Sequence, residues 1–212
     1  MSDVVKAIET LRGVVTITFD GAEPLRMPRA AFREAPLAVG QAVNVEEYKQ
    51  TLLLSQYPQA LEYAVSLLAL RARSEGELRS RMQAKHYLDE AVDLALYKLR
   101  KERLINDEAF ARDWAAARTR HQLGKRRISM ELRQKGISAE MADQALDSVN
   151  EDEQTEQAVR LALKLLRRRA EDADERDVMR KAVQAMQRRG FGYDEAKNAL
   201  QTALEQLENE ED

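Results

Sequence analysis

The chain has 212 residues, of which 44% are hydrophobic and 33% are charged, and its formal net charge is −3. This apolar content is enough to form a core, and the scarcity of Gly and Pro favours helices over sheets. The absence of cysteine excludes disulfide scaffolds and thiolate metal sites, and it is compatible with a reducing compartment.

The first residues, MSDVVKAIETLRG, lack the basic start and the long apolar run of a secretory signal. No stretch of the sequence approaches the roughly 20 apolar residues that a membrane-spanning helix needs. We therefore expect a soluble cytoplasmic protein without a membrane partner.

Residues 1–57 are predicted to form a small module with a hairpin and one short helix. Apolar residues alternate with threonine from Val15 to Phe19, and Asp20-Gly21 is typical of a turn. Leu25 and Met27 fit a second strand. The prolines in this region break longer helices.

Three similar segments follow, beginning at Leu78, Ile128 and Ala182. Apolar residues recur at matching positions, with offsets of 50 and 54 residues between copies: Met82, Leu132 and Met186; Tyr87, Ile137 and Phe191; Leu96, Leu146 and Leu200. Their spacing predicts a helix, a tight turn and a second helix in each copy.

The predicted turns lie at Lys85-His86, Lys135-Gly136 and Arg189-Gly190. Glycine suits the left-handed residue that ends many helices, and the apolar residue after it should pack back onto the pair. In the first copy His86 takes the place of glycine, which predicts backbone strain or a different turn.

A further helix precedes each pair, beginning at Leu61, Asp107 and Glu156. We therefore predict an all-α fold of three tandem three-helix repeats in an elongated or curved array, following the β-hairpin module. The predicted boundaries are 1–57 for the module, 58–105, 106–150 and 151–208 for the repeats, and 209–212 for an acidic tail.

The sequence contains no recognisable catalytic, cofactor-binding or metal-binding constellation. It lacks a phosphate-binding glycine loop, and its two histidines, His86 and His121, lie in different repeats. Acidic pairs such as Asp107 and Glu108 are more simply explained as stabilising a helix N-terminus. We expect a protein that is not an enzyme and needs no cofactor.

The most informative feature is a basic cluster from Arg118 to Lys135, which holds seven basic residues and only Glu131 of opposite sign. Three of its cations fall in the first turn of a predicted helix, where they oppose the helix dipole. Arg126, Met130 and Arg133 should face outward, opposite Ile128 and Leu132. We predict a contact surface for an acidic partner or a phosphate backbone, formed by Arg118, Arg120, Lys125, Arg126, Arg127, Met130, Arg133 and Lys135.

The segment INDEAFARDWAAARTRHQLGKRRISMELRQKGIS resembles the central part of the RecX family of regulatory proteins, and SEGELRSRM resembles the first RecX repeat. The resemblance covers about residues 58–206. It rests on Asp107, Phe110, Ala111, Arg118, Gly124, Ile128, Glu131, Leu132, Lys135, Gly136 and Ile137. His86 departs from the glycine of the family, and the third repeat is degenerate.

The resemblance implies a non-enzymatic protein, expected to be monomeric, that binds the RecA recombinase. Such a protein enters the groove of the RecA filament on single-stranded DNA and lowers ATP hydrolysis, strand exchange and co-protease activity. Some members also bind DNA directly. The resemblance does not assign these roles to individual residues.

Two other hypotheses remain open from the residues alone. Three-helix units also resemble helix-turn-helix domains, so the chain could be a nucleic-acid-binding module acting without RecA. It could also be a helical adaptor for a different protein.

Overall fold

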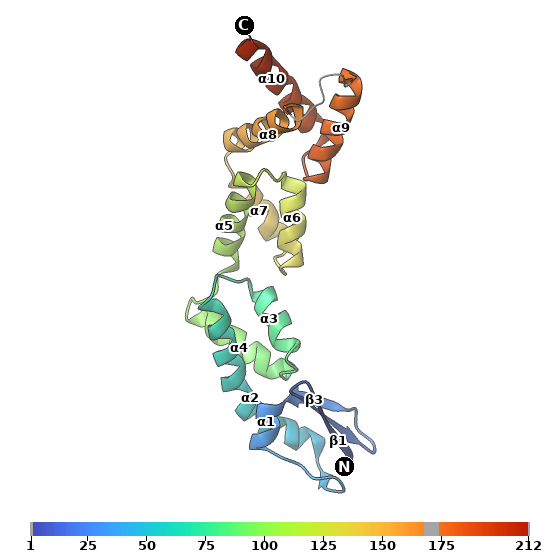
Figure 1. Ribbon diagram of the computed structural model, residues 1–212. Coiled ribbons are helices and arrows are strands. Elements are labelled where there is room, and N and C mark those ends of the chain that lie inside the picture. Colours follow the sequence, from blue (N-terminus) through green and yellow to red (C-terminus); the bar gives the residue numbers. More distant parts are fainter. Residues whose placement is uncertain (1, 168–173, 212) are drawn as a thin grey trace. The chain divides into compact units, whose positions relative to one another are not determined.

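The computed structural model describes residues 2–167 and 174–211, and it divides into two compact units, residues 1–106 and 107–212 (Figure 1). The prediction of three-helix repeats that follow a small β-containing module is confirmed. Within the part of the chain that the structure describes, none of the helices combines the length and apolar character needed to cross a membrane.

The first unit contains a small sheet and the first repeat. Its elements are β1 (Asp3–Leu11), β2 (Val14–Phe19), β3 (Leu25–Pro28), α1 (Arg29–Glu34), β4 (Ala42–Val43), α2 (Val45–Leu68), α3 (Glu75–Gln83) and α4 (Asp89–Lys101).

The sheet is antiparallel, with strand order β3-β2-β1-β4. Strands β2 and β3 form the predicted hairpin, and α1 is the predicted short helix. Strand β1 was not predicted, because a bulge between Val5 and Ala7 interrupts the alternation that identifies a strand. Arg12 and Gly13 connect it to β2, both with positive φ, as a two-residue hairpin turn requires.

Helix α2 joins the module to the first repeat, so the boundary at residues 57 and 58 falls inside a helix. Pro58 lies within α2, and the helix predicted from Leu61 is therefore the C-terminal part of a longer helix that continues through a proline. The fully buried Gln56 accepts a 2.7 Å hydrogen bond from the backbone N–H of Leu88, the residue before α4. Because Leu88 also packs on the core of the sheet, this contact fixes the repeat to the module.

The second unit contains the other two repeats. Its elements are α5 (Asp107–Arg120), α6 (Lys125–Gln134), α7 (Ala139–Asp147), α8 (Glu151–Leu166), α9 (Glu175–Arg188) and α10 (Tyr193–Glu211). The predicted acidic end at 209–212 continues α10 to Glu211, and Asp212 lies outside the described residues.

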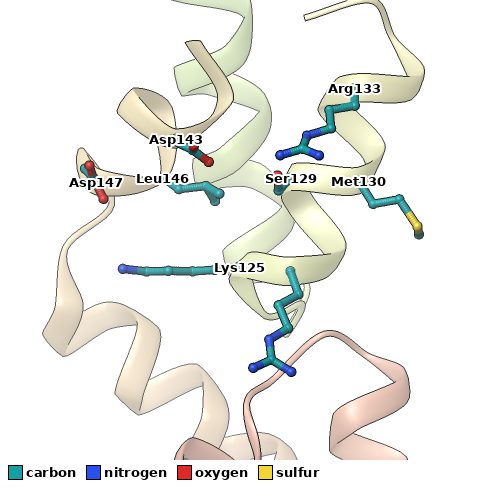
Figure 2. A pocket seen from close by; sticks show the side chains of 8 residues that line it. Lys125, Ser129, Met130, Arg133, Asp143, Leu146 and Asp147 are labelled. Carbon is teal, nitrogen blue, oxygen red and sulfur yellow. The ribbon is translucent and has the colours of Figure 1, made fainter. Parts of the chain in front are cut away.

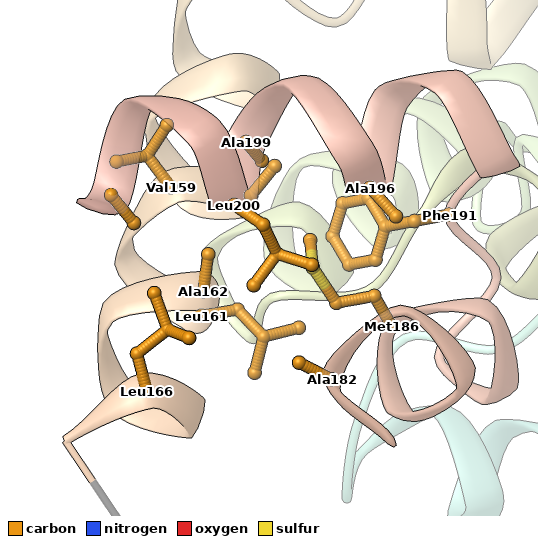
Figure 3. Packing of buried hydrophobic residues seen from close by; sticks show 12 residues of the cluster. Val159, Leu161, Ala162, Leu166, Ala182, Met186, Phe191, Ala196, Ala199 and Leu200 are labelled. Atoms are coloured by element: carbon orange, nitrogen blue, oxygen red, sulfur yellow. The ribbon is translucent and has the colours of Figure 1, made fainter. Parts of the chain in front are cut away.

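Each repeat has its own hydrophobic core, formed by the apolar positions that recur between copies. Leu132 and Ile128 are fully buried in the second repeat. In the third repeat, Met186, Phe191 and Leu200 meet between α8, α9 and α10 (Figure 3). The aligned apolar positions of the sequence are therefore core positions.

The three predicted turns share one hydrogen-bonding pattern. The backbone N–H of Phe191 donates to the Met186 carbonyl at 3.2 Å, and Tyr87 and Ile137 make the equivalent bonds. This is the pattern of a Schellman turn, which needs a left-handed residue just after the helix. His86, Gly136 and Gly190 fill that position with φ of 61°, 82° and 93°. The predicted strain at His86 is therefore present.

Replacing His86 with glycine should stabilise the protein by about 0.5–1 kcal/mol. A left-handed φ costs a residue with a Cβ roughly 1–2 kcal/mol, and the greater flexibility of glycine in the unfolded chain offsets part of the gain. The measurement is the free energy of unfolding in urea.

The matched control is Gly136→Ala, which introduces a Cβ at the equivalent turn and should cost about 1–2 kcal/mol. If His86→Gly destabilised the protein, the imidazole would have to contribute contacts that outweigh the strain.

Candidate partner-binding surface

The basic cluster of the sequence is organised around the buried carboxylate of Glu131 on α6. Arg118 on α5 donates to it from Nε at 2.6 Å and from Nη2 at 2.8 Å. Arg127, one helical turn before Glu131, donates from Nε at 3.3 Å, and Trp114 donates from its indole Nε1 at 3.3 Å. A forked pairing of this kind is among the strongest polar interactions in proteins, and it fixes α5 against α6.

These contacts hold the pKa of the Glu131 carboxyl group below its ordinary value of 4.5. The hydrogen bond from Arg118 is the main cause, burial opposes it, and the charge of Arg118 and the bonds from Arg127 and Trp114 reinforce it. The carboxylate therefore stays ionised to lower pH than an ordinary glutamate, because charged donors favour its ionised form.

Aromatic rings complete this arrangement. Phe110 and Trp114 are stacked on α5, with ring centroids 5.8 Å apart. The Lys135 ammonium lies 3.9 Å from the centroid of the Trp114 ring, and the Arg118 guanidinium lies 5.2 Å from it. Both distances are within the range of cation–π attraction. Phe110 is buried in the core of the second repeat, and the partly buried Trp114 packs against that core.

Three cations of the predicted surface therefore interact with other residues of the same repeat: Arg118 and Arg127 pair with Glu131, and Lys135 lies over the Trp114 ring. Because this cluster of seven basic residues contains a single acid, its sequence suggests that neighbours leave the cations unneutralised; this is wrong at Arg118 and Arg127, which both pair with Glu131. The segment from Arg118 to Lys135 contains only Glu131 as an opposing charge, and the order of residues along the chain does not show which cations this acid reaches. The fold places that single acid within reach of both arginines.

The remaining side chains are on the outer face of the repeat. Arg120, Arg126 and Arg133 are exposed, and Met130 is 40% exposed, which confirms the outward direction predicted for the α6 residues. Among the described residues, no ion pair within 4 Å involves Lys125, Arg126 or Arg133.

These α6 residues line a shallow pocket of about 510 Å³ between α6 and α7 (Figure 2). Helix α6 contributes Lys125, Arg126, Ser129, Met130 and Arg133, and α7 contributes Asp143, Leu146 and Asp147. The surface is thus of mixed charge. Asp143 and Asp147 follow the basic cluster in the sequence, and only the packing of α7 against α6 brings them to the basic face.

A contact between the second and third repeats fixes the position of α6. The N–H of Gly124 donates to the Arg189 carbonyl at 2.9 Å, and the N–H of Arg126 donates to the Gly190 carbonyl at 3.3 Å. A Cβ on Gly124 would lie 2.4 Å from the Gly190 carbonyl group, so the two backbones meet without intervening side chains. Helix α6 is therefore held at its first turn.

The same contact explains why three cations are tolerated in the first turn of α6. The N-cap residue Gly124 has no side chain to accept hydrogen bonds from the exposed N–H groups. Carbonyl groups at the C-terminal end of α9 accept them instead, and this end carries partial negative charge. The arrangement offsets the repulsion between Lys125, Arg126, Arg127 and the helix dipole.

Comparison with known proteins identifies the family of each repeat. Residues 60–99, 106–146 and 151–200 match the models of the first, second and third three-helix domains of RecX. The chain is 34% identical over 154 residues to Regulatory protein RecX of Corynebacterium efficiens, which covers 68% of this chain and 73% of that protein. It is 36% identical over 153 residues to Regulatory protein RecX of Mycobacteroides abscessus, covering 69% and 74%.

A solved structure described as the crystal structure of regulatory protein RecX is also similar, with a TM-score of 0.63 and 26% identity. The similarity covers 92% of this chain and 97% of that one, so it extends into the N-terminal module.

Replacing Glu131 with glutamine should destabilise the protein by about 1–3 kcal/mol at neutral pH, because it removes the acceptor charge of a hydrogen-bonded cluster. Since the pKa of Glu131 is depressed in the folded state, its stabilising contribution is present above pH 4.5 and decreases as the pH falls below that value. Unfolding in urea at several pH values measures both effects.

The difference in stability between the wild type and Glu131→Gln should therefore shrink as the pH falls below 4.5. Glu140→Gln, at an exposed position on α7, is the control and should change little. A constant difference down to low pH would show that the carboxylate charge is not what matters.

Replacing Gly124 with alanine should destabilise the protein by roughly 1–3 kcal/mol or more, because the new methyl group would overlap the backbone of Gly190 and Phe191. Gly192→Ala is the matched control, because its nearest neighbour would be an ordinary contact at 3.9 Å. Thermal unfolding of the two variants distinguishes them, and equal melting temperatures would contradict a close backbone contact.

Proposed function

Because the chain belongs to the RecX family, we propose that it is a regulatory protein that binds RecA and inhibits the recombinase. In this proposal it enters the RecA filament on single-stranded DNA in the cytoplasm. It lowers ATP hydrolysis, strand exchange and co-protease activity by binding, without catalysis of its own.

The observation that carries this proposal is the exposed face of α6. Arg126, Met130 and Arg133 lie beside the pocket, with an apolar side chain between two guanidinium groups. Arginine and methionine are both enriched at protein interfaces, and arginine is common among residues that dominate binding energy. A partner surface that presents acidic groups would be complementary to these two arginines.

The predicted residues divide into two roles under this proposal. Lys125, Arg126, Met130 and Arg133 contact the partner directly, with Arg120 at the edge of the surface. Arg118, Arg127 and Lys135 act indirectly, because their bonds to Glu131 and Trp114 hold α5 and α6 in place. A rigid scaffold reduces the entropy lost when a partner binds.

The alternative of a nucleic-acid-binding module that acts alone is less well supported. Asp143 and Asp147 line the same pocket as the cations, and their charges would repel a phosphate backbone. If this surface bound DNA through phosphate contacts, its affinity for DNA would fall steeply as the salt concentration rises.

Replacing both Arg126 and Arg133 with alanine should leave the fold intact, because both side chains are exposed. Inhibition of the DNA-dependent ATPase of RecA should require at least about tenfold more protein, since one lost charge-assisted contact is worth roughly 1.5–3 kcal/mol. The measurement is a titration of RecA ATPase activity on single-stranded DNA.

The double variant Arg112→Ala/Arg176→Ala is the charge-matched control, because it removes two exposed arginines from α5 and α9. It should inhibit as the wild type does. No inhibition by the wild-type protein near equimolar RecA would count against the proposed function, and unchanged inhibition by the Arg126/Arg133 variant would exclude this face.

A further inference from the structure

The first and second repeats share an aspartate on the third helix but differ at the residue of the second helix that faces it. At the offset of 50 residues, α3 and α4 correspond to α6 and α7, so Arg79 corresponds to Ser129 and Asp93 to Asp143. In the first repeat Arg79 Nη1 donates to Asp93 Oδ1 at 2.6 Å, and Arg79 also pairs with Glu75 at 3.5 Å. The arginine therefore bridges the two helices of that repeat.

In the second repeat the bridging side chain is missing, but its acceptor is retained. Ser129 is too short to reach α7, and the pocket lies where the arginine would be. Figure 2 shows Ser129 on α6 and Asp143 on α7 on opposite walls. Asp143 is exposed, and among the described residues it takes part in no ion pair within 4 Å.

We propose that this pocket binds an arginine side chain of the protein partner, whose guanidinium group pairs with Asp143 as Arg79 pairs with Asp93. In the partner, acidic residues flank this arginine and form ion pairs with Arg126 and Arg133. The identity of the partner as RecA rests on the proposed function, whereas the chemistry of the pocket does not.

The shape and composition of the pocket fit this ligand. Met130 and Leu146 supply apolar surface for the aliphatic part of an arginine side chain. Asp147 adds a second carboxylate on the same wall, one helical turn from Asp143. A planar guanidinium group has several donors in fixed directions and can serve two carboxylates at once, unlike the single ammonium group of lysine.

The third repeat lacks these features. At the offset of 54 residues, Val183 corresponds to Ser129 and Lys197 to Asp143. With lysine in place of the aspartate, the third repeat lacks the carboxylate that would pair with an incoming guanidinium group. Of the three repeats, only the second combines a short polar residue at this position of its second helix with an aspartate at the facing position of its third helix.

The test uses the full chain and the peptide acetyl-Glu-Ala-Arg-Ala-Glu-amide as the probe. In amide NMR spectra of the isotope-labelled protein, millimolar peptide should shift the signals of α6 and α7 around Ser129 and Asp143. The same peptide with citrulline in place of arginine should bind at least about tenfold more weakly, because citrulline keeps the shape but loses the charge.

The decisive variant is Ser129→Arg, which restores the bridging arginine of the first repeat. Its new guanidinium group should pair with Asp143, occupy the pocket and weaken peptide binding at least about tenfold without loss of stability. Gln134→Arg is the control, because it adds the same charge at an exposed position of α6 outside the pocket. It should bind the peptide nearly as the wild type does.

Equal binding of the arginine and citrulline peptides would overturn the inference, as would the absence of shifts at millimolar peptide. A single-stranded oligothymidine that shifts the same amides more strongly than the peptide would overturn it in favour of DNA. If Ser129→Arg lost peptide binding but inhibited RecA as the wild type does, the pocket inference would stand and its use against RecA would fail.

Discussion

The surface of the second repeat depends on one buried carboxylate. Glu131 accepts hydrogen bonds from Arg118, Arg127 and Trp114. It thereby joins α5 to α6 where the arginines of the two helices lie close together. Without a compensating charge, two guanidinium groups this close would repel each other and force the helices apart. With it, they become structural contacts. The rest of the basic cluster can then remain on the exposed side of a fixed helix.

Backbone packing determines where that helix begins. The contact between Gly124 and Gly190 brings the N-terminus of α6 to carbonyl groups at the end of α9, which satisfies its N–H donors. The Schellman turn of the third repeat thus has two roles, since it ends α9 and also supports α6. Because Gly190 adopts a φ of 93° in this turn, glycine fits both its conformation and its close approach to Arg127.

The three repeats show how one scaffold can acquire different surfaces. Their cores and turns are equivalent. The side chains that face each other across the second and third helices of each repeat differ. In the first repeat an arginine–aspartate pair bridges these two helices, and in the second a serine lines a pocket between them. An exposed ion pair contributes little to stability, so its loss costs the fold little and leaves a carboxylate available to a partner.

The sequence by itself determined the helical repeat architecture, the left-handed turns at Gly136 and Gly190 and the outward direction of Arg126, Met130 and Arg133, because these follow from local spacing and backbone preference. It did not determine β1, which a bulge conceals, or the passage of α2 through Pro58. The tertiary structure alone decided which charges are neutralised. Glu131 lies 13 residues from Arg118, and Asp143 lies 14 residues from Ser129, so only helix packing reveals that the first pair is bonded and that the second faces across an open pocket.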